Sequence, residues 1–111
     1  METISWNDFE KIDIRVGTII EVKEFPKAKK PAYKLTIDFG KSGIKQSSAQ
    51  VTKFYSVEEL VGQQVIAVVN FPPKKIADFF SECLVLGIYD ENNDVVLIQP
   101  KHSVSNGSKI G

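Results

Sequence analysis

The 111-residue sequence is poor in the side chains that enzyme and metal sites most often use. His102 is its only histidine and Cys83 its only cysteine. One residue of each kind is too few for a zinc site, and a lone cysteine cannot form an intramolecular disulfide. His102 lies in a polar stretch, which is more typical of a solvated loop residue than of a catalytic base. The glycine motifs that hold nucleotide phosphates are also missing. We therefore predict a non-enzymatic protein with no catalytic residues, metal or cofactor.

Long apolar runs are missing as well. Hydrophobic residues make up 42% of the chain, but no run approaches the ~20 residues that a membrane-spanning helix needs. The opening residues, METISWNDFEK, lack the basic and apolar regions of an export signal. Cys83 lies inside an apolar run, as a small buried side chain would. We expect a cytoplasmic protein that forms one domain over residues 1–111.

Neither sign of charge is in excess. Fourteen basic residues balance fourteen acidic ones, which argues against a general polyanion binder, because such a protein neutralises many phosphates. Net charge averages over all faces, so this balance is compatible with a local basic patch. Arg15 is the only arginine, and bidentate reading of bases favours arginine over lysine. Any bound nucleic acid is therefore expected to be recognised by shape and backbone.

Alternating apolar residues predict a small β-barrel. The longest alternation covers residues 12–22, IDIRVGTIIEV, in which Gly17 is expected to produce a bend or bulge. Its predicted inward face consists of Ile12, Ile14, Val16, Ile20 and Val22. In the next strand, residues 33–39, the inward residues are expected to be Leu35, Ile37 and Phe39. Further strands are predicted at 44–50, 64–70, 83–89 and 95–100.

Short helices are predicted at two places. Ser5 or Asn7 can cap a single turn that contains Trp6 and Phe9. Residues 51–60 are predicted to form the second helix, because Ser56 and a glutamate three residues later have the spacing of a capping box. Five to six short strands with a helical segment after the third are typical of an OB-type barrel, in which that segment commonly closes one end. An SH3-like barrel is the alternative, although it contains less helix.

Residues 70–82, NFPPKKIADFFSE, combine a connector with a candidate binding edge. Its two prolines end the preceding strand, and Ile76, Phe79 and Phe80 then follow at helical spacing. Ile76 and Phe79 are expected to close a barrel end, while Phe80 has to point elsewhere because it is adjacent to Phe79. The alternative is that these aromatic residues form exposed apolar surface for a partner.

Two lysine clusters accompany this segment. One lies in and beside the proline-flanked loop 25–32, and the other follows Pro73. Their members are Lys27, Lys29, Lys30 and Lys34 in the first cluster, and Lys74 and Lys75 in the second. Such lysines either solubilise the surface or contact phosphates beside a barrel face.

Five segments, in order, resemble the tRNA-binding domain family. They are DIRVGTI at 13–19, FPKA at 25–28, YKLTIDFG at 33–40, EELVGQQV at 58–65 and NFPPKKIADFFSE at 70–82. The family includes free-standing dimeric tRNA-binding proteins, domains appended to some tRNA synthetases, and EMAPII-like domains. KKPAYKLTIDFG, SSAQVTKFY and VVNFPPKKIA further resemble the CsaA subgroup, small bacterial chaperones linked to protein secretion. The resemblance covers about residues 8–110 and implies an all-β OB-fold barrel and a homodimer.

The resemblance implies tRNA as one partner. The residues that match the RNA-facing side of the family, or flank it, are Arg15, Lys27, Lys29, Lys30, Asn70, Lys74, Lys75, Ser81 and Glu82. The lysines are expected to contact phosphates, and Asn70 and Ser81 to hydrogen-bond sugar or base. Glu82 is expected to organise a lysine rather than touch RNA.

The subgroup likeness implies a second activity, binding of unfolded or preprotein peptides in connection with the export machinery. The candidate peptide contacts are Phe71, Ile76, Phe79 and Phe80. The alternative to a combined role is a secretion chaperone that binds peptides only, without significant affinity for tRNA. A scaffold that only recruits proteins has no distinguishing feature in this sequence.

Apolar residues in both terminal segments independently favour a homodimer. These residues are Trp6, Phe9, Val104 and Ile110. A small barrel has little surface with which to cover them, whereas a twofold interface could bury them. The alternative is that they pack on their own barrel.

Overall fold

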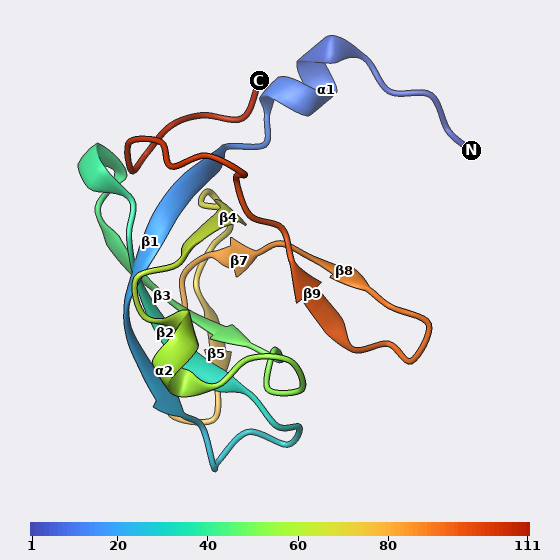
Figure 1. Ribbon diagram of the computed structural model, residues 1–111. Coiled ribbons are helices and arrows are strands. Elements are labelled where there is room, and N and C mark those ends of the chain that lie inside the picture. The colour runs from blue at the N-terminus through green and yellow to red at the C-terminus, as the bar shows by residue number, and fades with distance from the viewer.

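Five antiparallel strands form one sheet in the order β3-β2-β1-β4-β7 in the computed structural model, which describes residues 1–111. The strands are β1 (Ile14–Glu24), β2 (Tyr33–Asp38), β3 (Ile44–Ala49), β4 (Gln64–Val68) and β7 (Leu84–Val85). The long β1 pairs with both β2 and β4, and the sheet curls into a nearly closed, OB-like barrel (Figure 1). The predicted all-β barrel is thus confirmed.

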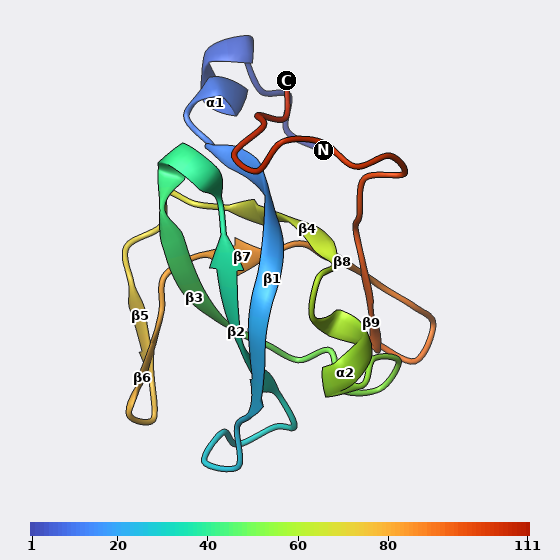
Figure 2. The same ribbon diagram turned by 60° about the vertical axis from the view of Figure 1, so that its left-hand side comes forward.

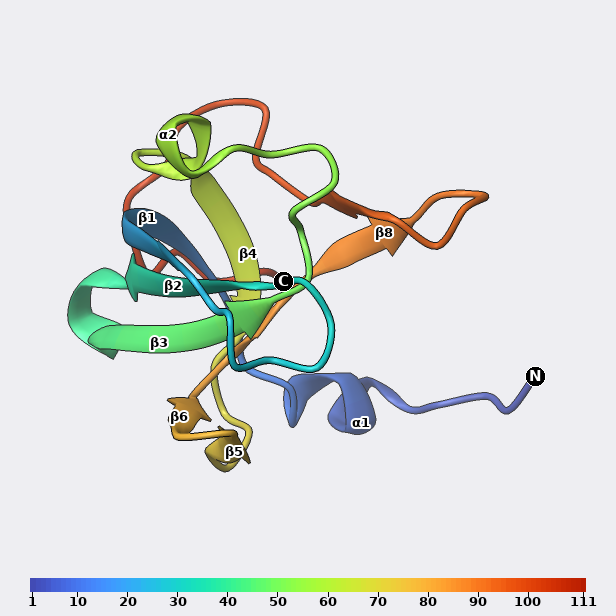
Figure 3. The same cartoon turned by 90° about the horizontal axis from the view of Figure 1, so that it is seen from below.

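Two hairpins stand outside this sheet. The first consists of β5 (Lys74–Ile76) and β6 (Phe79–Ser81), and the second of β8 (Gly87–Tyr89) and β9 (Val95–Leu97). Figures 2 and 3 show them projecting from different sides of the barrel. The single strand predicted at 83–89 is therefore wrong. The chain pairs with β4 through β7, and after Leu86 it leaves the barrel to pair with β9.

The predicted inward face of β1 is only partly correct: Val16 and Val22 are buried as predicted, but Ile12 and Ile20 are exposed. Its ladder with β2 shifts register between Ile19 and Glu21, which is a β-bulge, and a bulge reverses the alternation of the two faces. Gly17, Ile19 and Val22 are buried, whereas Ile20 is 46% exposed. Ile12 lies before the strand and is 42% exposed. The bulge therefore lies after Gly17, and not at it.

Gly17 has a different role from the predicted bend. A Cβ at this position would come within 2.6 Å of side-chain atoms of both Ile37 and Phe39. Real side chains do not tolerate such distances, so glycine lets β1 approach the core residues of β2. Leu35, Ile37 and Phe39 are all fully buried, which confirms their predicted inward positions.

Both helices are short and have capping boxes. Helix α1 (Trp6–Glu10) begins after Ser5, whose hydroxyl accepts from the N–H of Asp8. Helix α2 (Val57–Leu60) begins after Ser56, which bonds reciprocally with Glu59. The predicted helix over 51–60 therefore forms only in its last turn, after its cap. Leu60 is buried in the main core, as expected for the segment between the third and fourth strands. No helix is long and apolar enough to cross a membrane.

The helical spacing predicted within 70–82 does not produce a helix. Residues 74–81 form the β5–β6 hairpin, and Ala77, with φ of 54°, lies in its turn. Side chains alternate along a strand, so Phe79 is buried while Phe80 is 54% exposed. Ile76 and Phe79 pack with Phe25 in a small cluster separate from the main core. They therefore do not close the barrel end.

Candidate nucleic-acid and peptide interface

Loop 25–32 and the β5–β6 hairpin pack against each other. The Phe25 ring meets the Phe79 ring edge to face, with ring centroids 5.4 Å apart. The Lys34 ammonium lies over both rings, 4.7 Å from the Phe25 centroid and 5.3 Å from that of Phe79. In OB barrels, ligands bind on the face of strands two and three, between the loops that join strands one to two and four to five. Loop 25–32 and the hairpin occupy these two connections.

A salt bridge joins the tips of these two elements. Lys27 Nζ lies 2.8 Å from Asp78 Oδ2, and both side chains are more than half exposed. A hydrogen bond and charge attraction to Asp78 raise the pKa of Lys27, and the same contacts lower the pKa of Asp78. An exposed pair adds little stability. Its main consequence is that the charge of Lys27 is already balanced within the protein.

Four other lysines of the predicted RNA site make no salt bridge. They are Lys29 and Lys30 on loop 25–32 and Lys74 and Lys75 on β5. All four are exposed. Lys74 and Lys75 are adjacent in a strand, so their side chains point to opposite faces of the hairpin. The structure therefore brings unbalanced positive charge to both OB-type ligand loops.

Arg15 and Asn70 make internal contacts instead. Arg15 Nε donates to Asp13 Oδ1 at 2.7 Å, and Nη1 donates to the carbonyl of Gly107 at 3.1 Å. The Asn70 amide accepts from the N–H of Asp13 at 3.0 Å and donates to the carbonyl of Lys11 at 2.8 Å. These bonds tie the start of β1 to the end of β4 and to the C-terminal segment, which runs beside it (Figure 1). Both side chains hold the two terminal segments on the barrel.

Ser81 and Glu82 close the outer edge of β3 with their side chains. The Ser81 hydroxyl accepts from the N–H of Ser48 at 3.2 Å, and Glu82 Oε1 accepts from the N–H of Gln46 at 2.9 Å. The Glu82 N–H in turn donates to the Gln46 carbonyl at 2.7 Å. Glu82 therefore bonds to backbone and does not organise a lysine through a salt bridge. The unpaired edge of a strand can pair with another chain. These three hydrogen bonds occupy backbone groups on the edge of β3 without forming a regular β-ladder.

An apolar pocket of about 430 Å³ lies between the start of the hairpin and β7. We call it the Phe71 pocket; its lining consists of Phe71, Pro72, Pro73, Lys74, Ser81, Cys83 and Leu84. Phe71 and Leu84 are about half exposed, at 54% and 49%. Desolvation raises the pKa of the buried Cys83 thiol to about 11, so the thiol is neutral at physiological pH. Leu84 could not be predicted as a site residue, because a strand residue next to a buried cysteine carries no sequence signal of exposure.

The predicted peptide contacts are distributed over three surfaces. Phe71 lines the pocket, Phe79 and Ile76 pack under loop 25–32, and Phe80 is exposed on the other face of the hairpin. Of the predicted dimer contacts, Trp6 is 66% and Val104 is 43% exposed. Phe9 and Ile110 are partly buried, and the Ile110 N–H donates to the carbonyl of Ile14.

Comparison with known proteins gives a consistent result. Residues 14–109 match the family described as "Putative tRNA binding domain". The chain is 40% identical over 109 residues to a methionine–tRNA ligase from Porphyromonas gingivalis, covering 98% of this chain but only 16% of that protein. Among solved structures, the chaperone CsaA from Bacillus anthracis has a TM-score of 0.94 and 53% identity, covering 99% of this chain and all of that one. The CsaA chaperone protein from Picrophilus torridus has a TM-score of 0.91 and 54% identity, over 98% of this chain and all of its own.

Proposed function

This chain belongs to the tRNA-binding domain family, and on that premise we propose that it is a non-enzymatic module that binds the backbone of tRNA. The observation that carries the proposal is the set of exposed, unbalanced lysines on the two OB-type ligand loops: Lys29, Lys30, Lys74 and Lys75. Lysine ammonium groups neutralise phosphates as point charges, which suits recognition of shape rather than base sequence.

The remaining residues of the predicted RNA site take supporting roles in this proposal. Lys27 contributes less than its neighbours, because Asp78 balances its charge. Arg15 and Asn70 position the terminal segments, and Ser81 and Glu82 hold the β3 edge beside the hairpin. None of these four needs to touch RNA for the site to work.

Salt-dependent binding of bulk tRNA tests the proposal. Affinity should fall steeply as salt rises, and Lys74→Ala should reduce the slope of log affinity against log salt by about one. Lys101→Ala is the matched control, because this exposed lysine lies in the segment after β9, outside both loops. A wild-type affinity that does not respond to salt contradicts the proposal.

A second function, binding of unfolded or preprotein peptides for export, has its own support. The Phe71 pocket is apolar and open, as a site for extended segments requires, and the similar solved structures carry the name chaperone. Phe71→Ser should weaken suppression of client aggregation and leave tRNA binding unchanged, because Phe71 lines only this pocket. A protein that suppresses aggregation but binds no tRNA would instead fit the alternative, a purely peptide-binding chaperone.

A homodimer of this chain completes the proposal. The N-terminal segment and the β8–β9 hairpin both extend from the barrel on the right-hand side of Figures 1 and 3. Trp6 is exposed in the N-terminal segment, and Ile88 and Val96, a cross-strand pair, are exposed on the hairpin. Val104 is exposed in the segment after β9. A twofold interface would cover them and place two sets of lysines on one assembly, which raises affinity for a long ligand through effective concentration.

A further inference from the structure

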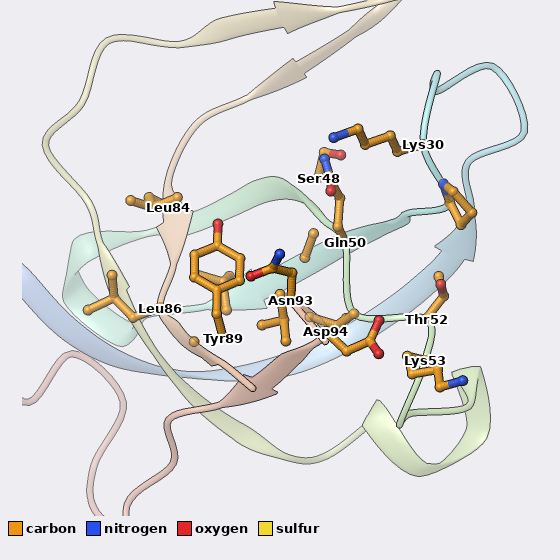
Figure 4. Close-up of a pocket in the computed structure, with 16 residues that line it drawn as sticks. Lys30, Ser48, Gln50, Thr52, Lys53, Leu84, Leu86, Tyr89, Asn93 and Asp94 are labelled. Carbon is orange, nitrogen blue, oxygen red and sulfur yellow. The ribbon is translucent and has the colours of Figure 1, made fainter. Parts of the chain in front are cut away.

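A second hollow, which we call the Tyr89 groove, lies between the β8–β9 hairpin and the barrel (Figure 4). Its volume is about 580 Å³, within the range of small-ligand sites. Its walls come from loop 25–32, from residues 48–53, from residues 84–87 and from the hairpin. It shares only Leu84 with the Phe71 pocket.

The groove offers one aromatic ring and several unpaired polar groups. The Tyr89 side chain is 74% exposed and lines one side. Figure 4 shows Asn93 and Asp94 next to it, with Lys53 beyond Asp94 and Lys30 at the upper rim. Neither lysine is in a salt bridge, and no side-chain hydrogen bond engages the Asn93 amide or the Asp94 carboxylate.

Strand geometry separates this groove from the proposed dimer surface. Tyr89 pairs with Val95 across the hairpin, and Ile88 pairs with Val96. Neighbouring residues in a strand point to opposite faces, so the Tyr89 side chain faces the groove while Ile88 and Val96 face away from it. A partner on the Ile88 face therefore leaves the ring available.

We propose that the Tyr89 groove holds one unpaired nucleotide of a bound RNA, an inference that rests on the proposed function. The base stacks on Tyr89. The Asp94 carboxylate accepts hydrogen bonds from ribose hydroxyls or the base edge, and the Asn93 amide can donate or accept there. Lys30 and Lys53 contact the flanking phosphates. Base stacking on aromatic side chains is a recurrent feature of single-strand binding by OB folds.

The position of Lys30 connects this groove to the surface already described. Lys30 belongs to loop 25–32, whose lysines are proposed to contact the RNA backbone, so one strand could run from that loop into the groove. The lining also fits a nucleotide better than an apolar peptide segment. It contains hydroxyl, amide, carboxylate and ammonium groups, whereas the Phe71 pocket has a mainly apolar lining.

The test uses a short single-stranded oligoribonucleotide that carries a fluorescent adenine analogue, whose emission falls when it stacks. Wild-type protein should quench this emission on binding. Tyr89→Leu should abolish the quenching and weaken binding roughly 5- to 150-fold, the equivalent of one lost base–aromatic stack. Tyr89→Phe is the matched control, because it keeps the ring, and it should behave as wild type. Lys53→Ala should keep the quenching but lower the salt slope by about 0.7, the value for one phosphate contact on a single strand.

The outcomes separate this inference from the proposed function. If wild-type protein binds neither tRNA nor the oligonucleotide, both are wrong. If Lys74→Ala weakens tRNA binding but Tyr89→Leu changes neither affinity nor quenching, only the nucleotide site is wrong. The nucleotide site is likewise overturned if Tyr89→Leu impairs peptide binding alone, or if Tyr89→Phe is as defective as Tyr89→Leu. Tyr89 is exposed, so both variants should keep the wild-type thermal unfolding temperature.

Discussion

The two hairpins outside the barrel both have strands of three residues, but their turns and surroundings differ. The β5–β6 hairpin carries two lysines and is held from the side by loop 25–32, through the Phe25–Phe79 contact and the Lys27–Asp78 pair. The β8–β9 hairpin has an acidic turn, with Asp90, Glu91 and Asp94, and it packs on the main core through Val95 and Leu97 of β9. There the Leu97 N–H donates to the Tyr55 hydroxyl at 2.9 Å. The first hairpin is therefore suited to a charged ligand. The second is suited to an apolar partner on one face, and its other face borders the Tyr89 groove.

The largest expected effect tests the anchoring of the first hairpin. Phe79→Ala should lower the free energy of unfolding by about 3 kcal/mol, because it removes a buried ring and leaves a cavity against Phe25. Phe80→Ala is the matched control, since that ring is more than half exposed, and it should cost less than about 0.5 kcal/mol. Urea unfolding measures both values. Equal losses would show that the hairpin is not held through one face.

The junction between the two hairpins makes a prediction about pH. Cys83 precedes β7, and burial raises its pKa from 9.0 to about 11. At pH 8 the native thiol should therefore react with an alkylating reagent about 100-fold more slowly than the unfolded chain, because the thiolate is the reactive form. The folded state favours the neutral thiol. The contribution of this thiol to the free energy of unfolding is therefore complete below pH 9 and is lost as the pH rises through about 11. Rapid alkylation of the native protein at pH 8 would contradict this assignment.

The apolar face of the second hairpin can be tested against the first. Ile88→Lys should raise the dimer dissociation constant tenfold or more, a cost of about 1.4 kcal/mol, because it puts a charge into the proposed interface. Phe80→Lys makes the same kind of change on the first hairpin and should leave the dimer intact. Light scattering at equal protein concentrations compares the two variants. Dissociation of both, or of neither, would place the interface elsewhere.

The smallest expected effect concerns the charge balance of the first hairpin. Asp78→Asn should release Lys27, increase tRNA affinity several-fold and steepen the salt slope by about one. Glu91→Gln removes an exposed carboxylate from the turn of the second hairpin and should change neither quantity. The ordinary pKa values of the two groups are 3.8 for Asp78 and 10.5 for Lys27, and the pair stays ionised between them. The difference in tRNA affinity between wild type and Asp78→Asn should therefore be constant around neutral pH. Unchanged tRNA binding by Asp78→Asn would mean that Lys27 lies outside the RNA surface.

Features that depend on local geometry were predictable from the sequence. The alternation of Leu35, Ile37 and Phe39 gave their inward positions, because side chains alternate along any strand. The cap at Ser5, one of two predicted candidates, and the capping box at Ser56 form through hydrogen bonds between residues three apart. The lysines of the two ligand loops could also be named, because exposed charge needs no partner to be recognised.

Features that depend on contacts between distant residues were decided by the tertiary structure. The bulge after Ile19 appears only in the register of β1 with β2, and it turned Ile20 outward. The helical spacing of Ile76 and Phe79 was overridden because Phe25 and loop 25–32 offer one face of a hairpin a buried surface.

The site residues show the same division. The sequence by itself determined a small β-barrel with lysines on two loops, since periodicity and charge are properties of neighbouring residues. Only the fold decided that Asn70 and Arg15 bond inward, that Asp78 balances Lys27 from 51 residues away, and that Tyr89 borders a groove. The physical reason is that hydrogen bonds, ion pairs and cavities form between surfaces that the chain brings together, and no local pattern encodes which surfaces these are.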